Sequence, residues 1–441
     1  MRDTVMELER MCSGDSAISL LVGFPDYSPP ENLVEYIKDT VSGKNIILNQ
    51  YCTTTNGHLP LLEAFADLYS PKFNRTLHPL KNIATSIGAT GALMKLFRSF
   101  TLPGDEIILF EPYYTLFYHM MQDTSGATAV TVPLHLNRSP NAVPPTSADF
   151  TFDPEELEAA FTEKTKMLLC NTPHNPTGKM FTREEMEIVA NLCKKHDVIC
   201  IADEVYEMFT YSDQEHIKMA TLPGMWERTV TVGSVGKLFG MTAWATGYVI
   251  GPEHLIEKYL QRVVIPMNTV LQDVYAQAYR HELNRLDQPN CFFKALPREL
   301  KAKRDQVMHI MSGIGLEPIA PEGGYFIFAD VSKFDDQYCQ ASGDKASNFA
   351  LWLCKEKGIG VAPASVFYST ANSHLGENYI RICFVKSEAT LNIAEDRLKG
   401  VKVSRNNDEI CNVLANGKGG LANCKDDLVN GKEDLTNSKD G

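Results

Sequence analysis

The residue with the most distinctive chemical setting in this sequence is Lys237, in the segment Ser-Val-Gly-Lys that begins at Ser234. The apolar run 229–232 before it predicts a buried strand, so Lys237 lies just past a strand end among small residues. An amine held there away from water has a lowered pKa and becomes a nucleophile. The Ser234 hydroxyl can donate to an anion. Taken alone, the pattern is more typical of a solvated loop lysine.

Two further polar motifs follow apolar runs upstream. Asn175 begins the turn Asn-Pro-Thr-Gly after the run 167–170, and Asp203, with Tyr206 three residues on, follows the run 198–202. Each motif has an ordinary interpretation, because asparagine often caps its own backbone in a tight turn and aspartate often caps a helix. If the runs are neighbouring strands, their ends bring an amide, a carboxylate, a phenol and an amine to one edge of a sheet.

This combination meets the chemical needs of pyridoxal 5'-phosphate. The aldehyde of that cofactor needs an amine to form a Schiff base, which Lys237 offers. Its pyridine nitrogen needs a carboxylate, here Asp203, to stay protonated so that the ring can draw electrons. Its phenolic oxygen needs donors, which the Asn175 amide and the Tyr206 hydroxyl supply. The order of the three motifs is far more specific than any one of them and predicts a site for this cofactor.

A glycine-containing helix start predicts where the phosphate of the cofactor would bind. The segment Ile-Gly-Ala-Thr-Gly from Ile87 opens a helix expected to reach Phe100. Small residues at a helix start expose backbone N–H groups, and the helix dipole favours an anion there. Thr90 adds a hydroxyl beside Ala89. A glycine pair alone is weak evidence, but together with the three motifs it indicates a phosphate cradle.

The sequence resembles the fold-type I aminotransferases that depend on pyridoxal phosphate. It is most similar to the group formed by kynurenine aminotransferases, glutamine transaminase K and cysteine-S-conjugate beta-lyases. The resemblance extends from about Gly23 to about Leu398 and rests on contiguous matches rather than on single residues. The matching segments are 23–26, 171–176, 203–207, 222–228, 234–237, 321–326 and 379–385.

The resemblance implies roles for residues that the motifs leave open. The family's counterpart of Tyr114 stacks on the pyridine ring, and that of Tyr51 reaches the cofactor phosphate of the neighbouring subunit, which implies a homodimer. By themselves, both are ordinary core or interface rings. Gly23, in an arm over the site, and Asn175 are implied near the substrate carboxylate. Arg381 lies in an apolar run, where either a buried salt bridge or, as the resemblance implies, a bidentate clamp on that carboxylate would satisfy it.

Composition narrows the class of protein. The 441 residues are 44% hydrophobic and 22% charged, as in ordinary soluble globular proteins, and the net charge of −13 disfavours a nucleic-acid partner. No run is long and apolar enough to cross a membrane. The 11 cysteines include no CxxC pair, which predicts reduced thiols in a reducing compartment. An acidic N-terminus without an apolar signal core makes the cytosol the expected location, with a mitochondrial one left open.

Apolar runs that alternate with helical segments predict an α/β fold with a mostly parallel sheet covered by helices on both faces. The resemblance implies the seven-stranded sheet of the fold-type I transferases. We expect a large cofactor-binding domain over 46–294 and a smaller α+β domain from 13–45 and 295–402, with a long helix over 297–312. Residues 403–441, which contain four seven-residue units with one leucine each, predict a disordered tail.

The candidate site residues and the family resemblance together predict ping-pong transamination. The amino acid would bind through its carboxylate to Arg381, and the freed amine of Lys237 would carry the proton between the two carbons that exchange it. The resemblance implies kynurenine, glutamine, methionine or aromatic amino acids as donors and 2-oxo acids such as 2-oxoglutarate as acceptors. Beta-elimination from cysteine conjugates is implied as a side activity, and no metal is expected.

Two positions depart from the family. Relatives carry arginine or lysine where this sequence has Ala245, so the cation that holds the cofactor phosphate is missing. Thr90 stands where the group tends to have tyrosine. Two alternatives therefore stay open. One is a weakly active or inactive paralogue that still binds the cofactor. The other is an eliminating enzyme on the same scaffold, such as the aminocyclopropane-carboxylate synthases.

Overall fold

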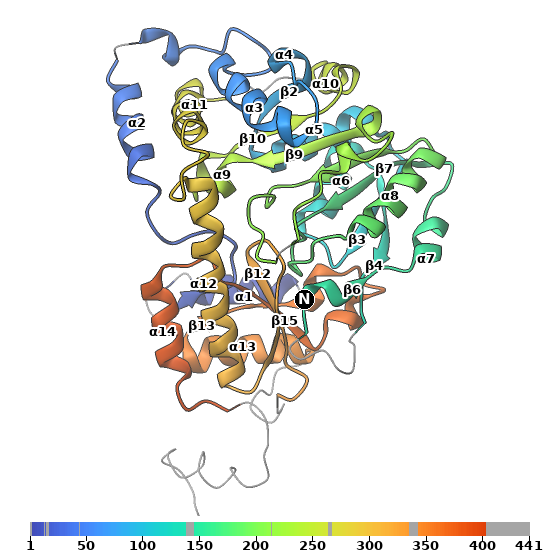
Figure 1. Cartoon of the computed structure of the whole chain (residues 1–441). Helices are drawn as coiled ribbons and strands as arrows, with labels where there is room; N and C mark the ends of the chain where they lie inside the picture. The colour runs from blue at the N-terminus through green and yellow to red at the C-terminus, as the bar shows by residue number, and fades with distance from the viewer. Residues whose placement is uncertain are drawn as a thin grey trace, which may run out of the picture.

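The computed structural model describes residues 2–12, 14, 17–43, 45–137, 145–212, 214–262, 267–334 and 343–402. The tail predicted from residue 403 onward lies outside these residues. Two sheets organise the described chain: a seven-stranded sheet in the upper part of Figure 1 and a four-stranded sheet in the lower part.

The large sheet has the strand order β2-β10-β9-β8-β7-β3-β4. Its strand β10 runs antiparallel to both neighbours, and the other pairs are parallel. This confirms the predicted mostly parallel sheet. The strands are β2 (Ile83–Ile87), β3 (Glu106–Glu111), β4 (Thr128–Pro133), β7 (Thr165–Asn171), β8 (Ile199–Asp203), β9 (Thr229–Ser234) and β10 (Thr246–Ile250).

Successive side chains of a strand point to opposite faces of the sheet. Helices cover both faces of the large sheet, so each strand contributes to two cores. Along β7, Met167 and Leu169 join one core, and Leu168 and Cys170 join the other. Burial on both faces explains why these strands are continuous apolar runs in the sequence. The first core packs under α5 (Gly88–Phe100), α6 (Leu116–Ser125) and α10 (Glu253–Leu260), and the second under α3 (Leu59–Lys72), α8 (Arg183–Lys195) and α11 (Thr269–Leu283).

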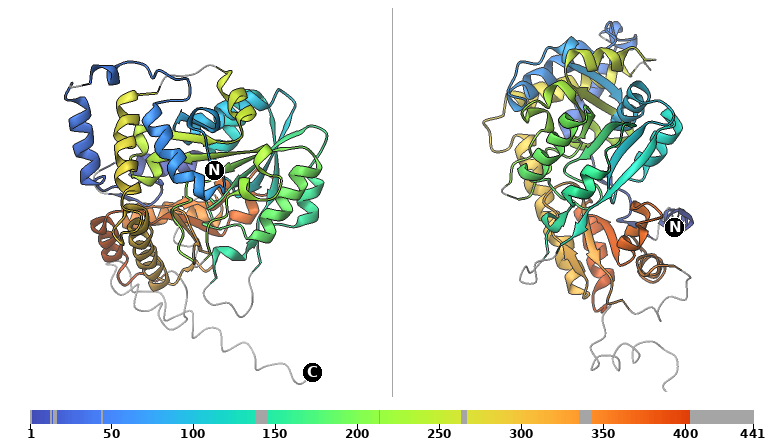
Figure 2. Two further views of the ribbon diagram at one scale, coloured as in Figure 1. Left: turned by 45° about the horizontal axis from the view of Figure 1, so that its top comes forward. Right: turned by 90° about the vertical axis from the view of Figure 1, so that its right-hand side faces the viewer.

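The small sheet is antiparallel, with the order β11-β12-β15-β14. Its strands are β11 (Glu317–Ile319), β12 (Phe326–Asp330), β14 (Ala362–Pro363) and β15 (Tyr379–Cys383). Helices α12 (Phe292–Gly313), α13 (Lys345–Lys357) and α14 (Glu388–Leu398) pack around it. The right-hand view of Figure 2 shows this smaller part below the larger one.

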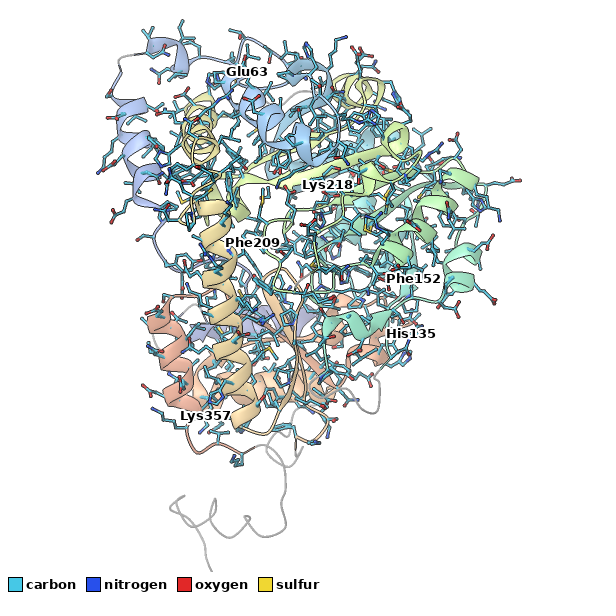
Figure 3. All side chains as sticks on the ribbon, in the orientation of Figure 1. Glu63, His135, Phe152, Phe209, Lys218 and Lys357 are labelled. Atoms are coloured by element: carbon cyan, nitrogen blue, oxygen red, sulfur yellow. The ribbon has the colours of Figure 1, made fainter. Side chains whose placement is uncertain are left out.

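Several contacts join the two parts. The long helix α12 runs from beside the large sheet to the small one (Figure 1). Phe209 lies between the parts in Figure 3, and its ring centroid is 5.0 Å from that of Tyr325. The first residues of the chain contact both: β1 (Ile18–Ser19) pairs with β13 (Ile359–Gly360), whereas α2 (Glu31–Val41) packs on α11.

Shorter elements complete the described chain. They are α1 (Arg2–Cys12), α4 (Pro79–Asn82), α7 (Pro154–Ala159), α9 (Val235–Leu238), β5 (His135–Leu136) and β6 (Phe150–Thr151). Local signals placed several element ends well. The capping box of Thr182 and Glu185 starts α8, as its sequence indicates, because each side chain accepts from the other residue's backbone N–H.

One predicted boundary is wrong for a physical reason. Helix α12 begins at Phe292 instead of Pro297, because Phe292 stacks on Phe239 at 5.3 Å and tertiary packing carries the helix past the proline. Strand β10 begins at Thr246, because Ala245 before it has the left-handed conformation, with φ 45° and ψ 46°. That conformation costs a non-glycine residue about 1–2 kcal/mol, so the surrounding turn must hold Ala245 in place.

Candidate active site

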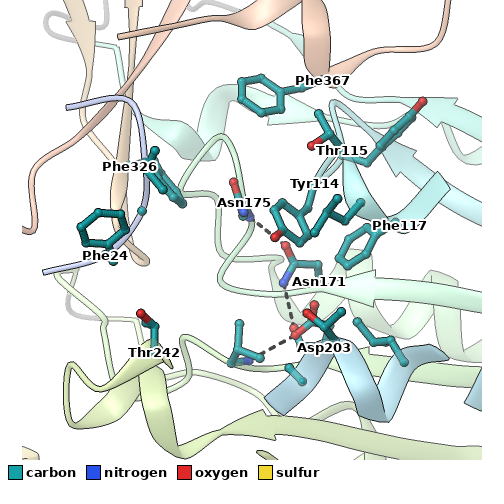
Figure 4. A pocket seen from close by; sticks show the side chains of 18 of the residues that line it. Phe24, Tyr114, Thr115, Phe117, Asn171, Asn175, Asp203, Thr242, Phe326 and Phe367 are labelled. Atoms are coloured by element: carbon teal, nitrogen blue, oxygen red, sulfur yellow. Dashed lines mark hydrogen bonds between the residues drawn. The ribbon is translucent and has the colours of Figure 1, made fainter. Parts of the chain in front are cut away.

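A cavity of about 1060 Å³ lies where the carboxyl ends of β7, β8 and β9 meet the small sheet. Parallel strands gather their carboxyl ends at one edge, and this is where ligands of such sheets bind. Figure 4 shows the cavity from close by. All but one of the residues predicted from sequence line it: Gly23, Ala89, Thr90, Tyr114, Asn175, Asp203, Tyr206, Ser234, Lys237 and Arg381.

Lys237 lies one turn after β9, in the short helix α9 that Ser234 caps. The backbone N–H of Lys237 donates to Ser234 Oγ at 3.3 Å. Its Nζ donates to the carbonyl oxygen of Gly23 at 2.8 Å and lies 5.8 Å from the ring centroid of Tyr206. Loss of water lowers the pKa of the Lys237 amine to about 8, and the nearby Arg381 guanidinium acts in the same direction. The solvated-loop interpretation of this lysine is therefore wrong.

Asp203 ends β8 with its carboxyl group pointing into the cavity. The side chain is 4% exposed, and burial raises the pKa of its carboxyl group to about 7. Its Oδ1 accepts from the Val205 backbone N–H at 3.4 Å, within a turn that no helix follows, so the helix-cap interpretation is wrong. Among the described residues no ion pair includes Asp203. A buried carboxylate of this kind is stabilised by a ligand that carries a positive N–H.

A chain of hydrogen bonds connects the ends of β7 and β8, as the dashed lines in Figure 4 show. The Asn175 backbone N–H donates to Asn171 Oδ1 at 2.8 Å, and Asn171 Nδ2 donates to the Asp203 carbonyl oxygen at 3.0 Å. The Asn175 side-chain oxygen accepts from Arg381 Nη1 at 3.1 Å. Asn171 was not among the predicted site residues, although it begins one of the matching segments.

Arg381 reaches the cavity from β15 of the small sheet. Its side chain is 7% exposed, and its Nη2 donates to the carbonyl oxygen of Leu21 at 2.9 Å. The rings of Phe326 and Phe367 lie 4.0 Å and 4.5 Å from the guanidinium carbon. Burial lowers the pKa of Arg381 to about 10, and its Nε has no hydrogen-bond partner among the described residues. No described carboxylate pairs with it, so the intramolecular salt bridge is excluded within this part of the chain.

Two tyrosines line the middle of the cavity. Tyr114 stands between Asn175 and Phe117 in Figure 4, and its ring meets that of Phe117 edge-on at 5.4 Å. Tyr206 lines the cavity as well and is buried, with 3% of its surface exposed. Burial raises the pKa of both phenols, so each keeps its proton and can donate. These hydroxyls can serve an acceptor on a bound ligand.

The opposite end of the cavity is formed by the start of α5 and the turn before β10. Ile87 occupies the cap position of α5 without a side-chain hydrogen bond, so the first N–H groups of the helix stay available to an anion. Ala89, Thr90 and Ser234 line this end together with Ala245. A Cβ atom placed on Gly88 would lie 3.8 Å from Ala245 Cα. Among the described lining residues, no lysine or arginine belongs to this end.

One predicted residue lies outside this cavity, as its implied role at the neighbouring subunit requires, and one helix contributes to the lining without having been predicted. Tyr51 does not line the cavity, and 80% of its surface is exposed in this single chain. Helix α1, for which no role was predicted, contributes Val5, Met6 and Glu9 to the lining. Nothing in the local sequence of α1 indicates this contact, because it depends on the packing of α1 against α13.

The described residues fit pyridoxal phosphate. Lys237 offers a desolvated amine, Asp203 a buried carboxylate without a cation, and Tyr206 a protonated hydroxyl. The uncapped start of α5 offers N–H groups to a phosphate. Arg381 keeps a buried N–H free for a carboxylate. These groups supply the amine, the carboxylate, the hydroxyl and the N–H donors that the cofactor and a substrate carboxylate need, and all of them belong to residues that line the same cavity.

Comparison with known proteins decides the family. The model for aminotransferases of class I and II matches residues 15–398. The chain belongs to this family. It is an aminotransferase that depends on pyridoxal phosphate and transfers an amino group from an amino acid to a 2-oxo acid.

Relatives and solved structures agree with this assignment. Human kynurenine--oxoglutarate transaminase 3 is 40% identical over 408 residues, which cover 91% of this chain and 88% of the relative. Human kynurenine--oxoglutarate transaminase 1 is 38% identical and covers 90% and 95%. The structure of Bna3p from Saccharomyces cerevisiae has a TM-score of 0.81 at 30% identity and covers 90% and 94%. They do not favour the inactive paralogue or the eliminating enzyme.

None of the described helices combines the length and the apolar character needed to cross a bilayer. No cluster of three or more histidine, cysteine, aspartate or glutamate side chains in the described part of the chain is arranged to hold a metal ion.

The first prediction concerns the chemistry of Lys237. Because its pKa is about 8 instead of 10.5, the amine of the cofactor-free protein loses its proton as the pH rises through about 8. The rate at which added cofactor produces a visible absorption band should therefore rise across pH 7–9 and level off above it. Lys237→Ala should abolish the band.

Lys95 supplies the control, because burial also lowers its pKa to about 8 but it lies outside the cavity. Lys95→Ala should keep the band and its pH dependence. A band that survives in Lys237→Ala after borohydride treatment and dialysis would show that another residue binds the cofactor.

The second prediction concerns Ala245. A charge-assisted hydrogen bond contributes about 1.5–3 kcal/mol, or about tenfold to hundredfold in affinity. Ala245→Arg or Ala245→Lys should tighten cofactor binding by this factor in titrations of the apoprotein. Alanine already has a Cβ at this φ, so neither substitution adds much backbone strain. Ala245→Gln is the uncharged control. Equal dissociation constants for all four proteins would mean that a cation from elsewhere, such as a partner subunit, already binds the phosphate.

Proposed function

We propose that this aminotransferase uses kynurenine and other amino acids with uncharged side chains, including glutamine, methionine and the aromatic amino acids, as donors. The acceptors are 2-oxo acids. The names of the relatives include oxoglutarate, and because of its second carboxylate 2-oxoglutarate should be a weaker acceptor here than 2-oxo acids with uncharged side chains. The proposal is supported by the names of relatives at about 40% identity. The observation that carries it is the position of Arg381, a buried guanidinium with a free N–H, between two aromatic rings opposite Lys237.

The charge of the lining supports uncharged donor side chains. Among the described lining residues, the lysines and arginines are Lys237 and Arg381 alone. Lys237 serves the cofactor and Arg381 the α-carboxylate, so no fixed cation is left for a second carboxylate on the substrate. Glu9, from α1, would repel one. Apolar and aromatic residues make up much of the remaining lining and suit a flat or apolar side chain.

Each site residue has a proposed task at the cofactor. The cofactor, when bound, supplies a ring that accepts electrons from the substrate Cα. Lys237 would bind it covalently, and Asp203 would hold its ring nitrogen in the protonated state. Asn175 and Tyr206 would donate to the phenolic oxygen, and Tyr114 would cover the ring face. The phosphate would bind to Ala89, Thr90 and Ser234, with Tyr51 of a second subunit reaching it.

Side chains of the protein can bind the substrate and transfer its proton. Arg381 and Asn175 would bind the α-carboxylate beside Gly23, which fixes the Cα atom above Lys237. With a pKa near 8, the Lys237 amine exists in both protonation states near neutral pH, so it can take a proton from Cα and return it elsewhere. The arm that carries Gly23 covers this amine and limits the access of water.

We further propose a homodimer. Apolar side chains of the segment 41–51 are exposed in the single chain: Val41 by 60%, Ile46 by 71%, Ile47 by 60% and Tyr51 by 80%. Neighbouring exposed apolar residues are typical of a protein–protein interface.

We also propose a cytosolic location, which is supported by the free thiols of the eight described cysteines.

The third prediction tests the donor class. The acceptor is one 2-oxo acid whose side chain is uncharged. With it, kcat/KM for kynurenine, glutamine, methionine and phenylalanine should each exceed that for aspartate by roughly tenfold or more. The physical reason is that the second carboxylate of aspartate would lose its hydration without gaining a charged partner. A rate for aspartate equal to that for kynurenine would refute the proposed specificity but leave the transaminase assignment intact.

The fourth prediction tests the shared site. Sedimentation of the active protein should show a dimer. Tyr51→Phe keeps the ring but removes the hydroxyl, so it should weaken cofactor binding by roughly tenfold while the sedimentation coefficient stays unchanged. An active monomer at assay concentration, or unaltered cofactor affinity in Tyr51→Phe, would contradict the proposed role of the partner subunit.

A further inference from the structure

A buried lysine outside the proposed chemistry holds the arm that covers the active site. Lys386 follows β15 and is 1% exposed. Its Nζ donates to the carbonyl oxygens of Val22 at 3.2 Å and Phe24 at 2.8 Å, and it lies 4.4 Å from the centre of the Phe24 ring. Among the described residues no ion pair includes Lys386.

Burying the Lys386 ammonium group costs free energy unless other groups replace the water that it loses. An ammonium group loses its hydration in the interior, and here two carbonyl dipoles and one aromatic face replace it. The interaction therefore depends on the arm keeping its position, and the arm depends equally on the lysine. A hydrophobic residue of similar length would fill the space without requiring either carbonyl to point inward.

Contacts on both sides fix the same segment. Arg381 Nη2 binds the Leu21 carbonyl oxygen at 2.9 Å. After Phe24, the Asp26 carboxylate accepts from the Ser387 backbone N–H at 2.5 Å and from the Thr390 hydroxyl at 2.6 Å. The two carbonyls bound by Lys386 are those directly before and after Gly23.

Gly23 is the residue of the arm that meets the reacting amine. Its carbonyl oxygen accepts from Lys237 Nζ, and a Cβ atom at this position would lie 2.4 Å from the Phe326 ring. A side chain at this position would therefore collide with Phe326, and glycine lets the arm lie this close to the small sheet while its carbonyl binds Lys237. The carbonyl on each side of Gly23 has to be held, and Lys386 holds both.

We propose that Lys386 is a positioning residue, which fixes the arm so that Gly23 faces Lys237 and the α-carboxylate of the substrate. Lys386 does not line the cavity and acts through residues 22–24. The inference rests on the proposed roles of Gly23 and Lys237, but the position of the arm is measurable without any turnover.

Hydrogen exchange followed by mass spectrometry tests the position of the arm. Lys386→Met removes the charge and all donors, Lys386→Gln keeps one donor group without charge, and Lys386→Arg keeps a charged donor. Exchange in peptides that span 17–30 should become about tenfold to hundredfold faster in the Met variant, less so in Gln, and least in Arg. Peptides from β7 and β8 should exchange as in the wild type.

Lys399→Met is the matched control, because Lys399 is an exposed lysine paired with Asp396 in the same small domain. It should leave exchange in the arm unchanged. Unchanged exchange of the arm in both Lys386→Met and Lys386→Gln would overturn the proposal. Equally faster exchange in all peptides would also overturn it, because Lys386 would then stabilise the whole fold instead of the arm.

Kinetics provide the second measurement. In Lys386→Met, KM for the amino donor should rise by about tenfold or more, while kcat changes less, because a displaced arm weakens the binding of the α-carboxylate. The visible band of the bound cofactor should persist, since Lys237 remains. A fall in kcat at unchanged KM would overturn the proposal. Loss of the band in Lys237→Ala tests the cofactor assignment separately, so the two can fail independently.

Discussion

Three cationic side chains without a carboxylate partner among the described residues converge on four consecutive carbonyl oxygens of the N-terminal arm. Arg381 binds Leu21, Lys386 binds Val22 and Phe24, and Lys237 binds Gly23. Carbonyl dipoles satisfy buried cations only partly, so the arrangement holds the arm against both sheets while leaving the cations able to bind anions. The cavity depends on this constraint, because the arm, the large sheet and the small sheet each form one of its walls.

The sequence predicts the large-sheet half of the site because local patterns determine it. Continuous apolar runs indicate strands buried on both faces, and polar residues directly after them fall at one edge once the strands are parallel. Asn175, Asp203 and Lys237 could therefore be placed together before any coordinates. Their chemistry follows from the residue types, and Arg381 was marked by the cost of a charge inside an apolar run.

Features that depend on distant packing left no local signal. Lys386 lies beyond a predicted strand like any loop lysine, and its role appears only when residues 22–24 are folded against it. The lining by α1 and the early start of α12 at Phe292 likewise depend on tertiary contacts. The sequence shows that position 245 lacks the cation of the family. It does not reveal the left-handed backbone of Ala245, because no glycine or asparagine marks the turn.

The distribution of charge explains how the site can work without a cation at residue 245. Among the described lining residues the cations, Lys237 and Arg381, lie beside the arm, whereas the end proposed to bind the phosphate offers neutral donors from α5, Ser234 and Thr90. The potential is therefore most positive where the α-carboxylate is proposed to bind. Desolvation beside these cations also keeps the Lys237 pKa near 8. The same charges can thus attract the substrate and keep the reacting amine able to release its proton, and cofactor affinity is left to hydrogen bonds and the covalent link.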